Sequence, residues 1–513
     1  MDRRLLLVCI LAFSMVKCED ISENVEALNK NATVVASEQA NSTAAESKHT
    51  DETQKAPAPK LPSLCTVCNC TGDIISCEDR NLTHHFEDSQ WPNVSISVAS
   101  FKGNSIANVK AFPKIAIEKL ILRGNNITKI ENAALKQLIN LAELDLSHNQ
   151  LTAENLQPQA FEGRFSVEAY EPLKKLAILD LSYNSLHSLH QDLFEHMSAL
   201  KVLNLSRNLF TQIDIRTSLA ISSLITLEEL DLSYCGLKSL PDTQFYNSSV
   251  CPRCRHLRKL DLSGNELTVP PSALGETTLE SLYLDENPIQ VINHVHSFPL
   301  MPKLKELSLC CMPHLTVIGP GAFAGLQALE NLRLQNCPKL ENVDEYALPS
   351  QKESQGPVWP PLKKLDLSDN ALRYLPTHFV ASWDSLEELD LMNNKWVCDC
   401  NNQYLIGTLL PQRGKKLMGD DVNTLTCASP PEHVGKNLTS LSHRKLRCLD
   451  VYGAKPEKDA TILIGVLIGL LLAIPVCLTI FVLWRRGFFF CGSHGPASFS
   501  RAFYKRTSND DEI

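Results

Sequence analysis

Hydrophobic and polar positions repeat in one pattern along the chain between Ile96 and Asn394. In each copy, positions one, four and six are apolar, and position nine is usually asparagine. The alternation of apolar residues predicts a short strand whose leucines point inward, followed by a segment that returns to the next strand. Twelve copies begin at Ile96, Ile117, Leu141, Leu176, Leu200, Leu227, Leu257, Leu279, Leu304, Leu329, Leu362 and Leu386.

The spacing of the copies predicts their architecture. Most neighbouring copies begin 21 to 27 residues apart, which is close to the period of leucine-rich repeats. A single coil cannot bury its own leucines, so the coils are expected to stack. The sequence therefore predicts an α/β fold: a leucine-rich-repeat solenoid over residues 96–395, with a curved parallel sheet on its concave face. Longer intervals place insertions near 152–172, 241–256 and 345–361, and the proline-containing last one is expected to be an exposed loop.

Two apolar segments outside the repeats predict a membrane topology. A short apolar run behind two arginines is typical of a secretory signal peptide, taken as residues 1–18. Residues 460–484 carry no charge and are long enough to cross a bilayer core of about 30 Å. Because Arg485 and Arg486 follow at once, the tail 485–513 is placed in the cytoplasm. We therefore expect a single-pass type I protein of the plasma membrane with an extracellular N-terminus.

Glycosylation sequons agree with this topology. The polar residues 19–64 are expected to form a disordered, glycosylated arm, and residues 450–459 a juxtamembrane stalk. All nine Asn-x-Ser/Thr sequons lie on the predicted extracellular side. They are Asn31, Asn41, Asn69, Asn81, Asn93, Asn126, Asn204, Asn247 and Asn437.

Cysteine clusters flank the repeats and predict two caps, over residues 65–95 and 396–449. The end coils of a solenoid expose leucines that inner coils bury, so each end needs a polar lid. Zinc binding is an alternative, because two cysteines separated by two residues resemble a metal knuckle. The secreted context favours disulfides instead. Within the second insertion, Cys251 and Cys254 are expected to staple the loop rather than to form a redox-active pair.

These clusters also carry a family resemblance. Residues 65–77 are similar to the N-terminal cap of extracellular leucine-rich-repeat proteins, and residues 394–448 to their C-terminal cap. The resemblance implies the pairs Cys65–Cys70, Cys68–Cys77, Cys398–Cys427 and Cys400–Cys448. The plan of residues 60–484 resembles the family of trophoblast glycoprotein, with 425–432 as the best local match. That resemblance implies inhibition of Wnt signalling and a role in cell adhesion or migration.

The concave face is the candidate surface for binding a partner. Strand alternation predicts that positions three, five and seven of each copy face it. These positions hold eleven acidic and six basic residues, and most of the aspartates are expected to be solvated sheet residues. Two clusters depart from the usual Leu-Asp-Leu-Ser filling and contain the residue types of interface anchors. They are Lys119, Ile121 and Arg123, and the pair Tyr283 and Arg333. A glycan on Asn204 would block the middle of the face and leave both flanks free.

Composition and motifs restrict the function classes. A formal net charge of -9 and the lack of a basic block argue against a nucleic-acid partner. No catalytic or metal-ligand pattern stands out, so we predict neither an enzyme nor a cofactor. The C-terminal residues Asp511, Glu512 and Ile513 are similar to the ligands of cytoplasmic PDZ proteins. The remaining hypotheses are a recognition protein that binds an extracellular ligand or co-receptor and modulates signalling, and a cell–cell adhesion molecule.

Overall fold

The computed structural model of the chain describes nine segments. They are residues 63–165, 170–171, 173–240, 255–275, 277–293, 297–352, 356–380, 383–448 and 456–486. The predicted signal peptide, Asn31, Asn41, Asn247, Cys251, Cys254 and the C-terminal Asp511, Glu512 and Ile513 lie outside them.

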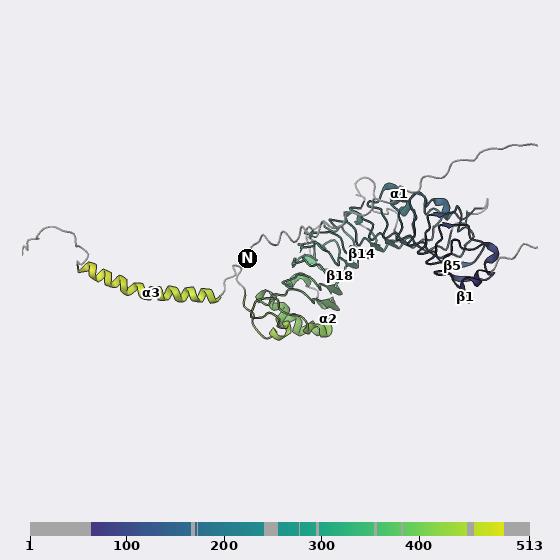
Figure 1. Cartoon of the computed structure of the whole chain (residues 1–513). Coiled ribbons are helices and arrows are strands. Elements are labelled where there is room, and N and C mark those ends of the chain that lie inside the picture. The colour runs from purple at the N-terminus through teal and green to yellow at the C-terminus, as the bar shows by residue number, and fades with distance from the viewer. Residues whose placement is uncertain are drawn as a thin grey trace, which may run out of the picture. The chain divides into compact units, whose positions relative to one another are not determined.

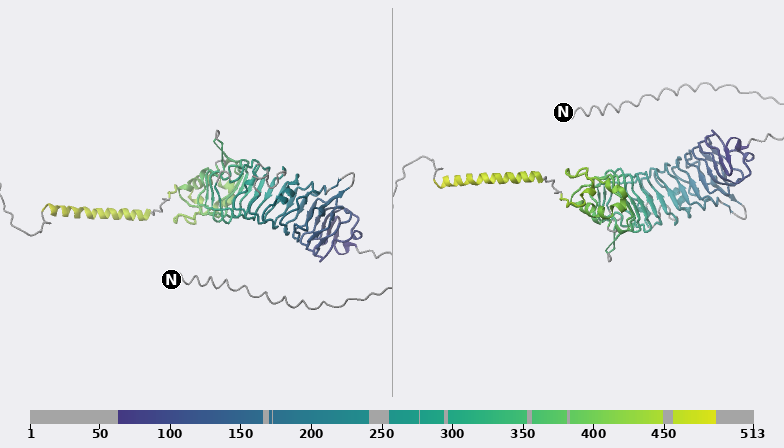
Figure 2. Two further views of the ribbon diagram at one scale, coloured as in Figure 1. Left: turned by 90° about the horizontal axis from the view of Figure 1, so that it is seen from above. Right: turned by 90° about the horizontal axis from the view of Figure 1, so that it is seen from below.

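One sheet of 14 strands runs through the described part of the repeat region. Its first two strands form an antiparallel hairpin, and the other twelve are parallel, one for each copy of the sequence pattern. Figures 1 and 2 show the coils stacked one behind the other. The solenoid fold is thereby confirmed. The twelve strands are β3 Ile96–Ser100, β5 Ile117–Ile121, β7 Glu143–Asp145, β10 Ile178–Asp180, β11 Val202–Asn204, β12 Glu229–Asp231, β13 Lys259–Asp261, β14 Ser281–Tyr283, β16 Glu306–Ser308, β18 Asn331–Arg333, β22 Lys364–Asp366 and β23 Glu388–Asp390.

The leucines of the pattern form a continuous core. Leu144, Leu179 and Leu203 occupy position four in adjacent repeats, pair in register, and are fully buried. Burial of one such side chain stabilises the fold by about 1.5–3 kcal/mol. Behind the sheet the chain returns through short elements. These are β4 Asn108–Val109, β6 Lys129–Ile130, α1 Ile215–Ser222, η4 Ser272–Leu274, β15 Val291–Ile292, β17 Val317–Ile318, β19 Asn342–Val343, η5 Thr377–Val380 and η6 Trp383–Ser385.

The asparagine at position nine joins successive coils. In the third repeat, Asn149 donates from Nδ2 to the carbonyls of Leu146 and Leu122, and its Oδ1 accepts from the backbone N–H of Ile127. One side chain therefore satisfies backbone groups of two coils.

Two repeats have a cysteine at position nine. The buried Cys235 and Cys337 donate from Sγ to the carbonyls of Leu205 and Leu309. Burial raises the pKa of Cys235 to about 12 and that of Cys337 to about 11. Both are therefore unreactive core thiols, as their position in the pattern indicates.

The insertions contain hairpins that the sequence pattern did not indicate. The first holds η3 Pro158–Phe161 and the antiparallel strands β8 Arg164–Phe165 and β9 Tyr170–Glu171. The third pairs β20 Ser350–Lys352 with β21 Gly356–Val358, so the expected loop is a β-hairpin. Leu348 and Ser350 at its base are buried, which anchors the hairpin to the solenoid.

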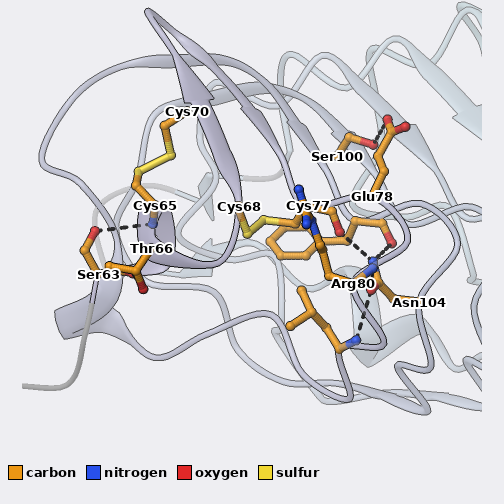
Figure 3. Close-up of a disulfide and its surroundings, with 12 residues drawn as sticks. Ser63, Cys65, Thr66, Cys68, Cys70, Cys77, Glu78, Arg80, Ser100 and Asn104 are labelled. Atoms are coloured by element: carbon orange, nitrogen blue, oxygen red, sulfur yellow. Dashed lines mark hydrogen bonds between the residues drawn. A yellow bond between two sulfur atoms is a disulfide. The ribbon is translucent and has the colours of Figure 1, made fainter.

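The N-terminal cap continues the sheet beyond the first repeat. It contains η1 Leu64–Thr66, β1 Asn69–Thr71, β2 Ile74–Ser76 and η2 Asp88–Gln90. Disulfides join Cys65 to Cys70 and Cys68 to Cys77 (Figure 3), and β2 pairs in parallel with β3. Leu64 is fully buried, so assigning it to the polar arm was wrong. The apolar side chain covers the end of the leucine core and belongs to the cap.

The C-terminal cap is helical. It contains η7 Cys400–Asn402, the π-helix η8 Leu405–Gly414, α2 Lys415–Met418, η9 Gly419–Asn423 and η10 Leu438–Leu441. Disulfides join Cys398 to Cys427 and Cys400 to Cys448. All four cap disulfides are the pairs that the resemblance implies. Because these cysteines are bonded to each other, the zinc alternative does not apply to them.

One helix is long and apolar enough to cross a membrane, by length and composition. Helix α3 spans Pro456–Arg485, and its apolar part, Ala460–Arg485, has a mean hydropathy of 3.0. The helix begins inside residues 450–459, so the end of the expected stalk is helical.

A buried histidine in the N-terminal cap is expected to make stability depend on pH. His85 stacks on Phe112, and its Nε2 lies 2.9 Å from the carbonyl oxygen of Lys110. Burial lowers the pKa of His85 below its usual 6.5. The unfolded chain therefore binds a proton more readily, so stability begins to fall once the pH drops below 6.5 and keeps falling toward the lowered pKa of the folded His85.

We expect the wild-type chain to lose more thermal stability between pH 7 and pH 5 than His85→Gln. The glutamine has no titrating ring and can keep a donor toward Lys110. Thermal unfolding of both chains at the two pH values measures the difference. Equal losses in the two chains would show that His85 does not couple protonation to folding.

Candidate partner-binding surface

Parallel pairing aligns position five of all twelve repeats in one row across the sheet. Most of these side chains are half-buried, while Ser100 and Ser308 are buried and Arg333 is exposed. The row consists of Ser100, Ile121, Asp145, Asp180, Asn204, Asp231, Asp261, Tyr283, Ser308, Arg333, Asp366 and Asp390.

Most aspartates of this row are held by the serine at position seven. Asp145 Oδ1 accepts from both the backbone N–H and the hydroxyl of Ser147, and Asp366 does the same with Ser368. Ser147 is fully buried, so the expectation that position seven faces the concave surface was wrong for such serines. The hydroxyl folds back onto the aspartate. Desolvation raises the pKa of Asp231, with a smaller contribution from the neighbouring Asp261.

The first predicted cluster is paired across the sheet. Lys119 Nζ lies 2.5 Å from Glu143 Oε1, and an Arg123 guanidinium nitrogen lies 2.9 Å from His148 Nε2. Ile121 is half-buried in the row between these cations. The strand register explains the ion pair, since Lys119 and Glu143 are direct partners on β5 and β7. The cluster is thus an apolar residue beside two partnered cations.

The second predicted cluster is split by a strand. Tyr283 and Arg333 both flank Ser308 in the row, which sets them two strand spacings, or about 10 Å, apart. The two residues are not direct neighbours. Desolvation, followed by the charge of Glu306, raises the pKa of Tyr283 to about 12. The Nζ of Lys259 lies 5.7 Å from the centre of the Tyr283 ring.

The structure brings out a further set of side chains, at position eight. His148, Tyr183, Arg207 and Tyr234 occupy this position in four successive repeats, and each has a φ between 51° and 54°. This left-handed conformation is uncommon for residues other than glycine. It separates position eight from the leucines that point inward. We name these four residues the edge ladder.

The sequence contains a signal for the edge ladder. Each member stands directly before the residue at position nine. In other repeats, glycine occupies this position eight, as Gly124 and Gly264 do. A large aromatic or basic residue at a position that requires a positive φ is unusual. Strand alternation assigns only positions three, five and seven to the concave face, so it does not predict the ladder at position eight.

Five of the sequons within the described segments are exposed and one is half-buried. Asn204 is the half-buried one, and its Oδ1 accepts from the backbone and the hydroxyl of Ser206. It lies on the central row, three residues before Arg207. A glycan on Asn204 would therefore extend over the middle of the concave face. The exposed five are Asn69, Asn81, Asn93, Asn126 and Asn437.

Comparisons with known proteins agree with this architecture. Leucine-rich-repeat family models match residues 115–166, 174–224, 226–247, 253–270 and 277–338. The chain is 31% identical over 326 residues to transforming growth factor beta activator LRRC32 of Pongo abelii, covering 54% of this chain and 46% of that protein. It is 30% identical over 274 residues to Tsukushi of Mus musculus, covering 53% of this chain and 70% of the relative.

Among solved structures, the chain is similar to one in the mouse RP105/MD-1 complex, with a TM-score of 0.48 and 20% identity, covering 72% of this chain and 53% of that one. This chain spans about half the length of LRRC32 (46%) and over two thirds of Tsukushi (70%). Repeat models and relatives agree with the twelve stacked coils, and the chain belongs to the leucine-rich-repeat family.

Proposed function

We propose that this protein is a cell-surface recognition glycoprotein that binds an extracellular protein partner and thereby modulates signalling. The observation that carries the proposal is a twelve-strand sheet, capped at both ends by disulfides, in a chain with one apolar helix suited to a membrane. A broad sheet face with exposed aromatic and basic side chains suits a protein surface better than a small substrate.

The proposed orientation is type I. Disulfides persist in oxidising compartments, which favours an extracellular repeat region. Arg485 and Arg486 at the end of α3 favour a cytoplasmic C-terminus. An epitope tag after the C-terminus should be detected only in permeabilised cells. Detection of the tag on intact cells would overturn this orientation.

The residues Asp511, Glu512 and Ile513 are proposed as a ligand for a cytoplasmic PDZ protein, and a tail peptide lacking Ile513 should lose that binding.

Binding of a partner could lead either to modulation of signalling or to cell–cell adhesion, and the two can be distinguished. The resemblance to trophoblast glycoprotein supports inhibition of Wnt signalling, and the name of the relative LRRC32, an activator of a growth factor, supports action on an extracellular signal. Cells expressing the full-length chain should change a Wnt reporter without clustering if the protein modulates signalling. Clustering with an unchanged reporter would favour an adhesion molecule. Proximity labelling on the same cells would identify the partner.

The flank with Lys119, Ile121 and Arg123 is the first proposed contact. Replacing Ile121 and Arg123 together with glutamate should reduce binding of the partner or its effect on signalling about tenfold or more, because an apolar anchor and its charged rim are both lost. Partner labelling and the reporter, each normalised to surface expression, measure the effect.

Lys364→Glu on the far flank is the matched control. Lys364 lies on β22 and pairs with Glu388, so this control reverses one cation on the far flank of the same sheet. Full activity of the double variant at normal surface expression would exclude this flank. The residues Tyr283 and Arg333 would then be tested next.

A further inference from the structure

The edge ladder is a continuous stack of rings and cations. The rings of His148 and Tyr183 are stacked, with centroids 3.8 Å apart and an interplanar angle of 15°. The guanidinium carbon of Arg207 lies 5.1 Å from the centroid of Tyr183 and 3.9 Å from that of Tyr234. Arg207 is therefore held between two tyrosine rings, a favourable cation–π geometry.

Both ends of the stack contact other residues of the solenoid. At one end, His148 contacts the guanidinium of Arg123. At the other end, the ring of Tyr234 lies over Gly264, where an added Cβ would come within 2.3 Å of ring carbons. Desolvation, followed by a hydrogen bond to Glu286, raises the pKa of Tyr234. The absence of a side chain at Gly264 thus leaves space for the ring of Tyr234, which extends across it toward Glu286 at position eight of the repeat after Gly264.

The edge of the Arg207 guanidinium is available to a ligand. Arg207 and Tyr183 are exposed, and among the contacts of the described residues the Arg207 side chain has no ion pair or hydrogen bond. Nearby lysines differ, because Lys201 pairs with Glu228 and Lys259 with Glu229. A guanidinium whose faces are covered by rings can still use its N–H groups for a carboxylate, in a two-pronged contact.

The stack also lowers the cost of binding. A free arginine loses side-chain entropy when it is fixed in an interface, whereas the two rings already restrict Arg207. The tyrosine rings provide apolar surface on both sides of the charge. Such a group matches an acidic side chain flanked by apolar atoms. Asp180 and Asp231 of the central row lie beside the stack and would repel a strongly anionic polymer. They would attract a basic residue of the ligand that stands next to its acidic residue.

We propose that Tyr183, Arg207 and Tyr234 form an anchor for an extended segment of the protein partner, whose acidic side chain binds the N–H edge of Arg207 between the two rings. This inference rests on the proposed function. It places the contact with the partner at position eight of three successive repeats, at the edge of the concave face. The sequon at Asn204 lies in the same repeat, so a glycan there would cover the anchor.

The probe is a library of random twelve-residue peptides displayed on phage, selected on cells that express the full-length chain. Selection is carried out on the wild-type chain and on Asn204→Asp, which removes the sequon. Asp145 and Asp366 make the same bonds to serine that Asn204 makes to Ser206, so this change is compatible with the local structure.

Peptides enriched on Asn204→Asp should carry aspartate or glutamate. In this background Arg207→Glu should weaken their binding at least about tenfold, and Arg207→Lys should weaken it as well, because lysine lacks the planar fork. The double change of Tyr183 and Tyr234 to alanine should have a similar effect. Lys364→Glu serves as the control for a distant charge reversal, and flow cytometry measures binding at equal surface expression.

Three results would overturn the anchor. They are a selection that enriches no acidic peptides, acidic peptides whose binding persists on Arg207→Glu, and heparin that binds through Arg207 while acidic peptides do not. If Arg207→Glu fails to reach the surface, Arg207→Gln replaces it, since glutamine adds no charge. The partner found by proximity labelling separates the two proposals. Equal labelling by Asn204→Asp with and without Arg207→Glu rejects the anchor only, whereas no extracellular partner for either the wild type or Asn204→Asp rejects the proposed function itself.

Discussion

Cys400→Ala is expected to keep most of the protein from reaching the cell surface. The change breaks the disulfide to Cys448, which closes 48 residues of sequence around the C-terminal cap. Leu441 and Leu446, both buried in the cap core, lie in the segment that this bond holds. Loss of a native disulfide costs a small secreted domain roughly 2–5 kcal/mol. We therefore expect the cap to open, expose the last leucine coil, and cause retention or aggregation.

Surface biotinylation and limited proteolysis measure this effect. Cys400→Ala with Cys448→Ala removes the unpaired thiol and so separates loss of the cap from mispairing. Cys477→Ala is the matched control, because Cys477 lies in α3 and has no disulfide. Normal surface expression and unchanged protease resistance of Cys400→Ala would contradict a stabilising role for this bond.

Asn265→Ala should destabilise the solenoid by about 4 kcal/mol or more. The buried Oδ1 of Asn265 accepts from the backbone N–H groups of Cys235 and Leu237, and Nδ2 donates to the carbonyls of Leu232 and Leu262. Alanine leaves these buried groups without partners, and each such group costs about 1–3 kcal/mol. Unfolding in urea, compared with the wild type, measures the loss.

Cys235→Ala offers a matched control in the preceding repeat. Cys235 occupies the same position nine and is also buried, but it contributes only weak thiol bonds, 3.3 Å to Leu205 and 3.5 Å to Ser233. We expect it to cost about 1 kcal/mol. If both variants lost the same stability, the amide would not be what joins the coils.

The sequence by itself determined the repeats. Leucines at positions one, four and six identify each strand, because only one face of a short strand can be buried. The position-nine asparagines identify the turns between coils, since backbone groups buried there need an amide partner. Both signals are local and occur within nine residues, so they can be read without knowledge of distant contacts. The cap disulfides Cys68–Cys77 and Cys398–Cys427 followed from a resemblance in the cysteine clusters.

The tertiary structure decided how the surface of the sheet is arranged. Paired residues on neighbouring repeat strands are 21 or more positions apart in sequence, and only the register brings Lys119 to Glu143 or separates Tyr283 from Arg333. The burial of Ser147 and Leu64 likewise depends on packing against other segments.

The edge ladder depends on both levels. The positive φ at position eight is a local feature, yet the stack around Arg207 forms only because tyrosines occupy that position in the repeats on either side. Local pattern thus specifies each coil, whereas contacts between coils specify which side chains a partner would meet.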